Sequence, residues 1–187
     1  MNRRSALLLV LGAALSASAC TTAHYDGRVA AQWASAPYTL ASGDKLRIIV
    51  FGQDTLSNIY AVDGAGRISM PLIGPVQVGG RSTAEAAQAI EAKLRAGFLR
   101  EPRVTVEVDS YRPFFVLGEV TNSGQFPFVN GMTVQTAVAI AGGFTPRALR
   151  TSAEITRQTA QGPVSAKVPV TYAVRPGDTI VIGERWF

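Results

Sequence analysis

The sequence has almost none of the side chains that enzymes use most often for chemistry. Its 187 residues include one cysteine, Cys20, and one histidine, His24. A single cysteine excludes an intramolecular disulfide, and a single imidazole excludes a multi-histidine metal cluster. Catalysis by a histidine-activated nucleophile would depend on His24 alone.

The chain also lacks a hydrophobic run long enough to cross a membrane. Its longest small and apolar run, Ala6 to Leu15, follows Arg3 and Arg4 and leads into Ser-Ala-Ser-Ala. A helix of that length spans about 15 Å, against roughly 30 Å of hydrocarbon. A basic start, a short apolar stretch and a small-residue end are typical of a secretory signal peptide, so we expect residues 1–19 to be removed.

Two interpretations of the cleavage point are open. Ala17-Ser18-Ala19 satisfies the ordinary small-x-small rule, and together with Cys20 it resembles a bacterial lipobox, although Ala17 stands where leucine is usual. A lone cysteine at this point of an exported protein has little structural use, so we predict that Cys20 is the lipid attachment residue. The alternative is a free thiol.

Positive charge is modest once the signal peptide is set aside. The formal charge of +5 falls to +3 when Arg3 and Arg4 are removed. The remaining basic residues form no run and no stripe with interleaved aromatics, so we expect no nucleic-acid partner. Residues 20–36, including His24, are predicted to form a solvated, lipidated tether.

Residues 37–110 are predicted to form a first strand-rich module. A glycine–aspartate turn at 43–44 precedes an alternating strand over 46–50. The capping box at 82–85 predicts a helix with one apolar face, and the period-2 run over 104–108 predicts a closing strand.

One turn phrase occurs twice in the mature chain. Residues 38–48 and 172–182 match without a gap at six positions. We interpret both as a structural turn, in which glycine allows an unusual backbone angle and aspartate caps nearby amides. A catalytic role is disfavoured because no histidine, serine or lysine arrangement accompanies them. The defining residues of the two turn motifs are Gly43, Asp44, Gly177 and Asp178.

Residues 111–187 are predicted to form a second strand-rich module. It begins with a strand over 114–117 and contains a helix that Thr133 caps and Gly142-Gly143 ends. Three further short strands follow. The fold class is therefore α+β, with two small strand-rich modules in series.

No catalytic motif occurs in either module. The sequence contains neither G-x-S-x-G nor H-E-x-x-H, and its glycine-rich segments lack the lysine of a phosphate-binding loop. A glycosidase-like carboxylate pair stays open, since only geometry can exclude one. Phe114, Phe115, Phe126 and Phe128 are predicted core residues, with a sugar-binding platform as the alternative.

Several phrases occur together in a characteristic order. The first module contains Tyr38-x-Leu40-x-x-Gly43-Asp44-x-Leu46-x-Ile48, then Val62-Asp63-x-x-Gly66-x-Ile68, Pro71-Leu-Ile-Gly74 and Pro102-x-Val104-x-Val106. The second contains Val116-x-Gly118-x-Val120-x-x-x-Gly124, Gly142-Gly143-Phe144 and Pro176-Gly177-Asp178. In this combination the chain resembles the outer-membrane polysaccharide export proteins of Gram-negative bacteria. The first module is similar to their polysaccharide export domain, and the second to one soluble-ligand-binding β-grasp (SLBB) domain.

The resemblance implies a periplasmic lipoprotein, anchored at the outer membrane, that belongs to a capsular or exopolysaccharide export machine. It implies a homo-oligomeric ring, or collar, that passes the polysaccharide, and an inner-membrane polysaccharide copolymerase as partner. It implies no enzymatic activity, no cofactor and no metal.

The C-terminus departs from the longest family members. They continue into an amphipathic helix that lines a pore, whereas this sequence ends at Arg185-Trp186-Phe187. We therefore expect a short form without the pore helix, for which a separate outer-membrane β-barrel supplies the channel. Trp186 and Phe187 are predicted to close the core of the last strand, with a partner or membrane contact as the alternative.

Five arginines are candidate contacts for an acidic glycan or for the lumen of the collar: Arg103, Arg112, Arg147, Arg150 and Arg157. The alternative for each is a solvated surface position. Two other functions stay open. One is a periplasmic glycan-binding module that recognises polysaccharide without conducting it, and the other is a polysaccharide-modifying enzyme.

Overall fold

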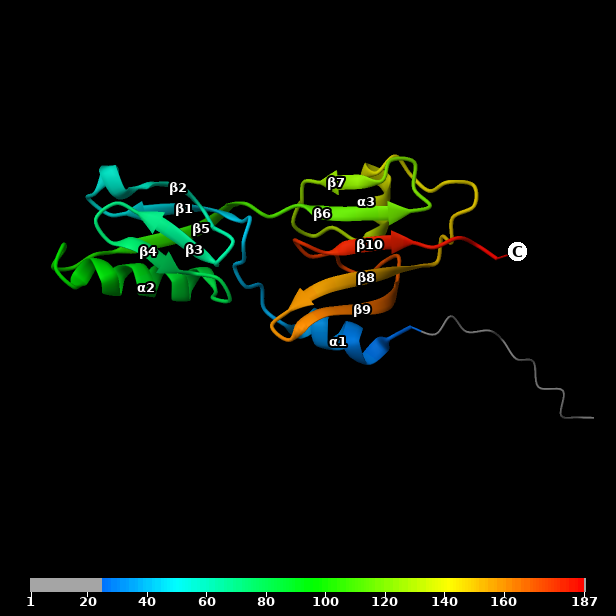
Figure 1. The fold of residues 1–187 in the computed structure, drawn as a ribbon, viewed down its shortest axis with the longest axis horizontal. Helices are drawn as coiled ribbons and strands as arrows, with labels where there is room; N and C mark the ends of the chain where they lie inside the picture. The colour runs from blue at the N-terminus through cyan, green and yellow to red at the C-terminus, as the bar shows by residue number, and fades with distance from the viewer. Residues whose placement is uncertain (1–24, 187) are drawn as a thin grey trace, which may run out of the picture.

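A computed structural model describes residues 25–186 as two modules placed side by side along the long axis of the molecule (Figure 1). The predicted signal peptide, Cys20, His24 and Phe187 lie outside the described residues. Three α-helices and ten strands lie within the described range, and each module has its own hydrophobic core. The α+β fold class with two modules in series, the second β-grasp-like, is confirmed.

The first module is a small antiparallel sheet with a hairpin and a helix. Its elements are β1 (Lys45–Val50), a 3-10 turn η1 (Asp54–Leu56), β2 (Asn58–Ala61), β3 (Arg67–Met70), β4 (Gly74–Gln77), α2 (Thr83–Arg95) and β5 (Val104–Ser110). The sheet order is β2-β1-β5, and β3 pairs with β4. Helix α2 packs against β5 and β4.

Local sequence explains the two elements that hold this module together. Alternate residues of β1 are buried, with Leu46, Ile48 and Val50 at most 1% exposed, as the period-2 pattern predicts. The Ser82–Glu85 capping box is formed at the start of α2. Burying each such aliphatic side chain contributes about 1.5–3 kcal/mol.

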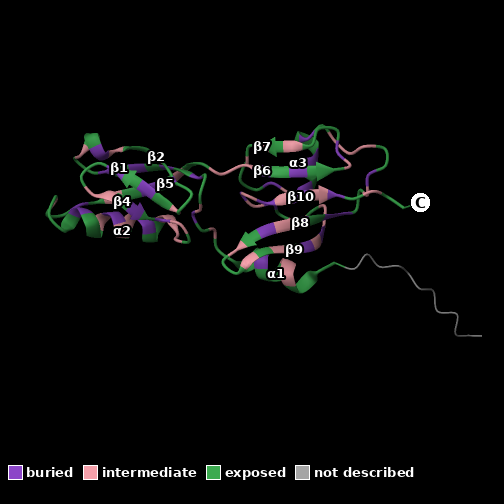
Figure 2. Cartoon of the chain, in the orientation of Figure 1, coloured by how far each residue is buried: buried purple, intermediate pink, exposed green. Residues whose placement is uncertain are grey.

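The second module is a mixed five-stranded sheet covered by a short helix. Its elements are β6 (Phe114–Gly118), β7 (Gly124–Phe126), α3 (Val134–Ile140), β8 (Ser152–Thr159), β9 (Gly162–Pro169) and β10 (Thr179–Ile182). The order is β7-β6-β10-β8-β9, with β6 and β10 parallel and the other pairs antiparallel. Thr133 caps α3, and Gly142 follows it with a φ of +84°. Figure 2 shows how buried and exposed residues alternate along the strands of both modules.

Part of the predicted tether is a helix in the structure. Helix α1 (Gly27–Ser35) packs beside β9 of the second module, and its Trp33 is 6% exposed and belongs to that module's core. The Tyr172 hydroxyl donates to the Ala30 carbonyl at 2.7 Å. The described chain therefore starts on the second module, crosses to the first, and returns through residues 111–113 (Figure 1).

The aromatic predictions divide between core and surface. Phe114 is fully buried, whereas Phe115 is 38% exposed on the other face of β6. Trp186 is 83% exposed, so the prediction that it closes the core is wrong: β10 ends at Ile182, and Trp186 lies beyond the sheet. Within residues 25–186, every helix is too short or too polar to span a bilayer.

Candidate functional site

The two matching phrases form the same hydrogen-bonded turn. In each, the aspartate N–H donates to the carbonyl three residues earlier, Asp44 to Ala41 at 3.2 Å and Asp178 to Arg175 at 3.1 Å. Each carboxylate accepts in return from the N–H of that earlier residue, at 2.9 and 2.8 Å. The intervening glycines have φ values of +92° and +83°, a region that glycine occupies without strain.

Both aspartates are fully buried, and each is paired with an arginine. Asp44 accepts from Arg112 Nη1 at 3.1 Å, and Asp178 accepts from Arg157 Nε and Nη2 at 2.8 and 2.7 Å. The second arrangement is bidentate, the geometry in which a guanidinium binds a carboxylate most strongly. A buried carboxylate needs such a partner because its desolvation is otherwise very costly.

Arg112 lies between the two turns and ties the modules together. It follows β5 in the short connection to the second module, yet its side chain and backbone N–H both bind Asp44 of the first module. A β-carbon on Gly43 would lie 3.2 Å from the Arg112 β-carbon, and one on Gly177 would lie 2.6 Å from its Nε. The absence of side chains on both glycines therefore lets both turns close on the same arginine.

Tyr38 completes the environment of Asp44. Its hydroxyl donates to Asp44 at 2.5 Å and accepts from Arg112 Nη1 at 3.1 Å. Burial, and then the hydrogen bond to Asp44, raise the pKa of the Tyr38 phenol well above its usual value. Its ring also contacts Tyr111 edge-on at 5.2 Å, which adds an aromatic contact to the polar link between the modules.

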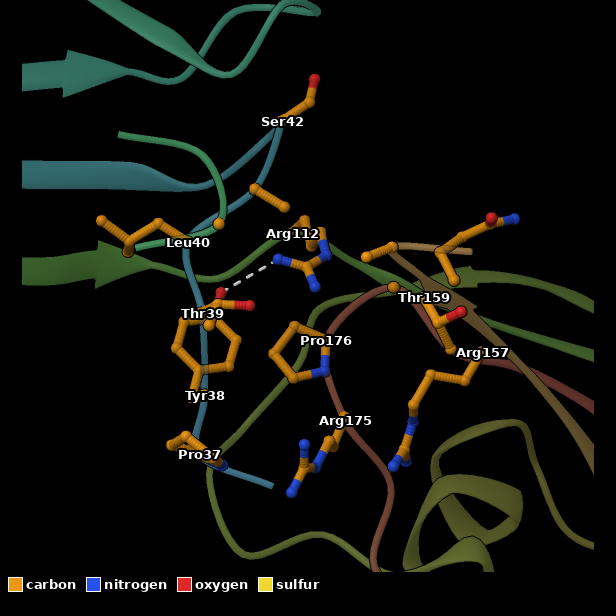
Figure 3. A pocket seen from close by; sticks show the side chains of 15 residues that line it. Pro37, Tyr38, Thr39, Leu40, Ser42, Arg112, Arg157, Thr159, Arg175 and Pro176 are labelled. Atoms are coloured by element: carbon orange, nitrogen blue, oxygen red, sulfur yellow. Dashed lines mark hydrogen bonds between the residues drawn. The ribbon is translucent and has the colours of Figure 1, made fainter. Parts of the chain in front are cut away.

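A cleft of about 540 Å³ opens at this junction, lined mainly by residues 37–42, 157–160 and 175–177 together with Arg112 (Figure 3). Arg157 and Arg175 belong to these lining segments. The Arg157 guanidinium stacks on Trp33 of α1, 4.6 Å from the ring centre. Arg175 donates to the Ala36 carbonyl. Burial, and then the nearby Arg157 charge, lower the pKa of Arg175.

Of the five candidate glycan-contact arginines, Arg112 and Arg157 line this cleft and the other three lie elsewhere. Arg112 is held at the junction by Asp44, a position that leaves its side chain 24% exposed. Arg103 precedes β5, at the end of that strand away from the junction. Arg147 and Arg150 lie on the loop between α3 and β8, where Arg147 pairs with Glu184.

The arrangement can hold two modules in one orientation and present cations to a cleft. The described residues contain no histidine or cysteine, and no three acidic side chains among them are grouped closely enough to ligate a metal ion. The arginines and hydroxyl-bearing residues that line the junction cleft can bind a ligand by charge and by hydrogen bonding.

Sequence reasoning missed three residues of this site. Trp33 lay in the segment predicted to be a tether, and Tyr38 and Arg175 were noted only as parts of the repeated phrase. The sequence did contain a signal for two arginines. Arg175 lies at the start of the second turn, and Arg112 lies just before the strand that opens the second module. The sequence does not show that Arg112 contacts both turns, by binding Asp44 in the first and by packing against Gly177 in the second.

Two family models match the chain. Residues 33–109 match the model described as polysaccharide biosynthesis/export protein, and residues 113–168 match the SLBB domain. Between the matched ranges lies the connection that contains Arg112.

Curated relatives carry names from the same field. The exopolysaccharide production protein ExoF of Rhizobium meliloti is 34% identical over 147 residues, which are 72% of this chain and 32% of the relative. A polysialic acid transport protein, KpsD of Escherichia coli, is 27% identical over 111 residues, 58% of this chain and 20% of the relative. The chain thus spans about a third or less of the length of these relatives. With an export domain, an SLBB domain and these relatives, the chain belongs to the polysaccharide export protein family.

Proposed function

We propose that this protein is a periplasmic component of a bacterial machine that exports capsular polysaccharide or exopolysaccharide. In this proposal it forms a homo-oligomeric collar that passes the polymer toward the outer membrane. The proposal is supported by the two matched domains and by relatives named for exopolysaccharide production and polysialic acid transport.

The observation that supports the collar proposal is the set of contacts at the junction between the modules. The chain crosses between them twice, and Asp44, Arg112 and Tyr38 bind one another at the crossing. A ring closes only if each subunit presents its two contact surfaces at a fixed angle. A two-module subunit with a buried ion pair at its junction meets that requirement better than one with a free linker.

Membrane attachment is proposed to occur through Cys20. A signal peptide over residues 1–19 would deliver the chain to the periplasm, and acyl chains on Cys20 would hold it on the periplasmic face of the outer membrane. An inner-membrane polysaccharide copolymerase would then deliver the polymer to the collar, and a separate outer-membrane protein would provide the channel.

A second candidate function is glycan recognition without conduction. The arginine-lined cleft at the junction favours it, because a cleft of about 540 Å³ is a suitable size for a small ligand. The two functions differ in what they require: conduction requires a closed oligomer, whereas recognition is possible for a monomer.

Oligomeric state is the property that separates these candidates. The protein should be extracted from membranes with its N-terminus intact and examined by native mass spectrometry. The collar proposal predicts one closed assembly with a fixed number of subunits. A strict monomer under all extraction conditions would contradict the collar and favour the glycan-binding module.

Lipid attachment can be tested on the same material. In cell fractionation, Cys20→Ala is expected to move the protein from the membrane fraction to the soluble periplasmic fraction, while the neighbouring control Thr21→Ala leaves it with the membranes. Retention of Cys20→Ala on washed membranes would refute anchoring through this residue.

A further inference from the structure

Three arginines line the cleft at the junction, and only two of them are paired with a carboxylate. Asp44 is paired with Arg112 and Asp178 with Arg157, and these two carboxylates are both fully buried. Arg175 also lines the cleft, and among the described residues it forms no ion pair. Its one side-chain hydrogen bond goes to a neutral acceptor, the Ala36 carbonyl.

Arg157 adds a donor that nothing satisfies. Arg157 is 8% exposed. Its Nε and Nη2 donate to Asp178, whereas its Nη1 is buried without a hydrogen-bond partner. Buried donors are nearly always paired in proteins, and a guanidinium donor is among the most costly to leave unpaired. The unpaired donor leaves positive charge on Arg157, a residue that lines the cleft.

The two cations also act on each other. Figure 3 shows the Arg157 and Arg175 side chains on the same side of Pro176, and the pKa of Arg175 is lowered first by burial and then by the charge of Arg157. An anion bound to Arg175 would relieve this repulsion, because its negative charge attracts both guanidiniums.

We propose that the junction cleft binds the carboxylate of an acidic sugar, with Arg175 as its cationic donor and the buried Arg157 guanidinium as a second positive charge beside it. A sugar source, rather than a free anion, rests on the proposed export function. It is also supported by the cleft walls, where the half-buried Tyr38 and the exposed Pro37 offer apolar faces to a pyranose ring (Figure 3).

The proposal can be tested by isothermal titration calorimetry on the purified mature protein at low ionic strength. The probes are trigalacturonate as the acidic sugar, maltotriose as its neutral counterpart, and inorganic phosphate as a free anion. We expect trigalacturonate to bind at least about tenfold more tightly than maltotriose, because the neutral sugar leaves Arg175 without a counter-charge. Added salt should weaken binding.

Arg175→Gln is the decisive variant, and Arg100→Gln is its matched control. Both remove one positive charge, but Arg100 is exposed on the loop between α2 and β5, away from the cleft lining and in no ion pair of the described chain. Arg175→Gln should weaken trigalacturonate binding roughly tenfold, and Arg100→Gln should leave it unchanged. Arg175→Lys, which keeps the charge, should retain binding better than Arg175→Gln, and this guards against an effect of misfolding.

Three results would overturn the proposal: no binding of trigalacturonate, equal binding of maltotriose, or equal weakening by Arg175→Gln and Arg100→Gln. Phosphate binding that Arg175→Gln abolishes, without uronate binding, would refute the sugar assignment. Failure here is distinct from failure of the export function. Calorimetry tests the cleft in isolation, and export is measured in cells by where the polymer accumulates.

Discussion

Replacing Asp178 with asparagine tests the buried ion pair that supports the second module. The substitution keeps the shape of the side chain and an oxygen that can accept from the Arg175 N–H, which lies 2.8 Å from Asp178 Oδ2 in the wild type. It removes the charge opposite Arg157, whose guanidinium is bound bidentately at 2.8 and 2.7 Å. The turn is therefore preserved, and a buried cation is left without its counter-charge.

The expected loss of stability follows from that burial. Breaking a buried ion pair by removing one partner costs about 3–5 kcal/mol. Trp33 lies 4.6 Å from the Arg157 guanidinium with or without the Asp178 charge, so its attraction does not alter the difference. We therefore expect Asp178→Asn to lower the free energy of unfolding by about 3–5 kcal/mol, a large part of the roughly 5–15 kcal/mol of a typical domain.

Urea denaturation followed by tryptophan fluorescence measures this loss. The chain has two tryptophans, the buried Trp33 and the exposed Trp186, so a Trp186→Phe background leaves Trp33 as the reporter of the second module. A loss of this size should lower the midpoint by about 1–2 M urea.

The double variant Arg157→Met, Asp178→Asn is the control, because it removes both charges. It should be more stable than the sum of the two single effects predicts, with a coupling energy of at least about 1 kcal/mol. A loss below about 1 kcal/mol in Asp178→Asn, or strict additivity in the double variant, would refute the assigned role of the pair.

Two further predictions concern backbone packing and alkaline pH. Gly118 has a φ of +85°, and an added β-carbon would lie 2.1 Å from the Ile182 carbonyl oxygen, so Gly118→Ala should cost about 3 kcal/mol or more in thermal unfolding. Gly183→Ala, whose added methyl meets nothing within 4 Å, should stay within about 0.5 kcal/mol of the wild type; equal melting temperatures for the two variants would contradict this account. Because the pKa of Tyr38 is raised in the folded protein, the unfolded chain loses the phenol proton at lower pH. The contribution of Tyr38 to the free energy of unfolding is therefore complete below pH 10.0 and declines above that value, by at most about 1.4 kcal/mol per pH unit. The stability advantage of the wild type over Tyr38→Phe should therefore shrink above pH 10.0 in urea titrations, and a constant difference would refute the assignment.

Local sequence was sufficient for the elements whose stability is mostly local. The alternation over β1 and the capping box of α2 identify these elements because their side-chain patterns report directly on burial and on the first helical turn. The Thr133 cap and the glycines after α3 were identified for the same reason.

Helix α1 could not be predicted in this way. It has nine residues, and the side chain of Asp26 at its start does not cap it but accepts from the Lys167 N–H at 2.8 Å. Short helices are marginal in isolation, so α1 depends on contacts with β9 and on the burial of Trp33. Those contacts join residues far apart in the chain, which a local pattern cannot report.

The candidate site was predictable in part for a similar reason. The repeated phrase identified both glycine–aspartate turns, because a turn is formed within a few residues. The partner of Asp44 is Arg112, 68 residues later, and only the folded chain brings this pair together. The same holds for the excess charge of the cleft, which depends on where three separate arginines lie.

The proposed export role is tested most directly by measuring where the polysaccharide accumulates in a strain that lacks this gene. We predict that surface polysaccharide is lost while polymer is still made and retained inside the cell envelope, and that the wild-type gene restores surface polymer. Unchanged surface polysaccharide in the deletion strain would contradict the proposed function.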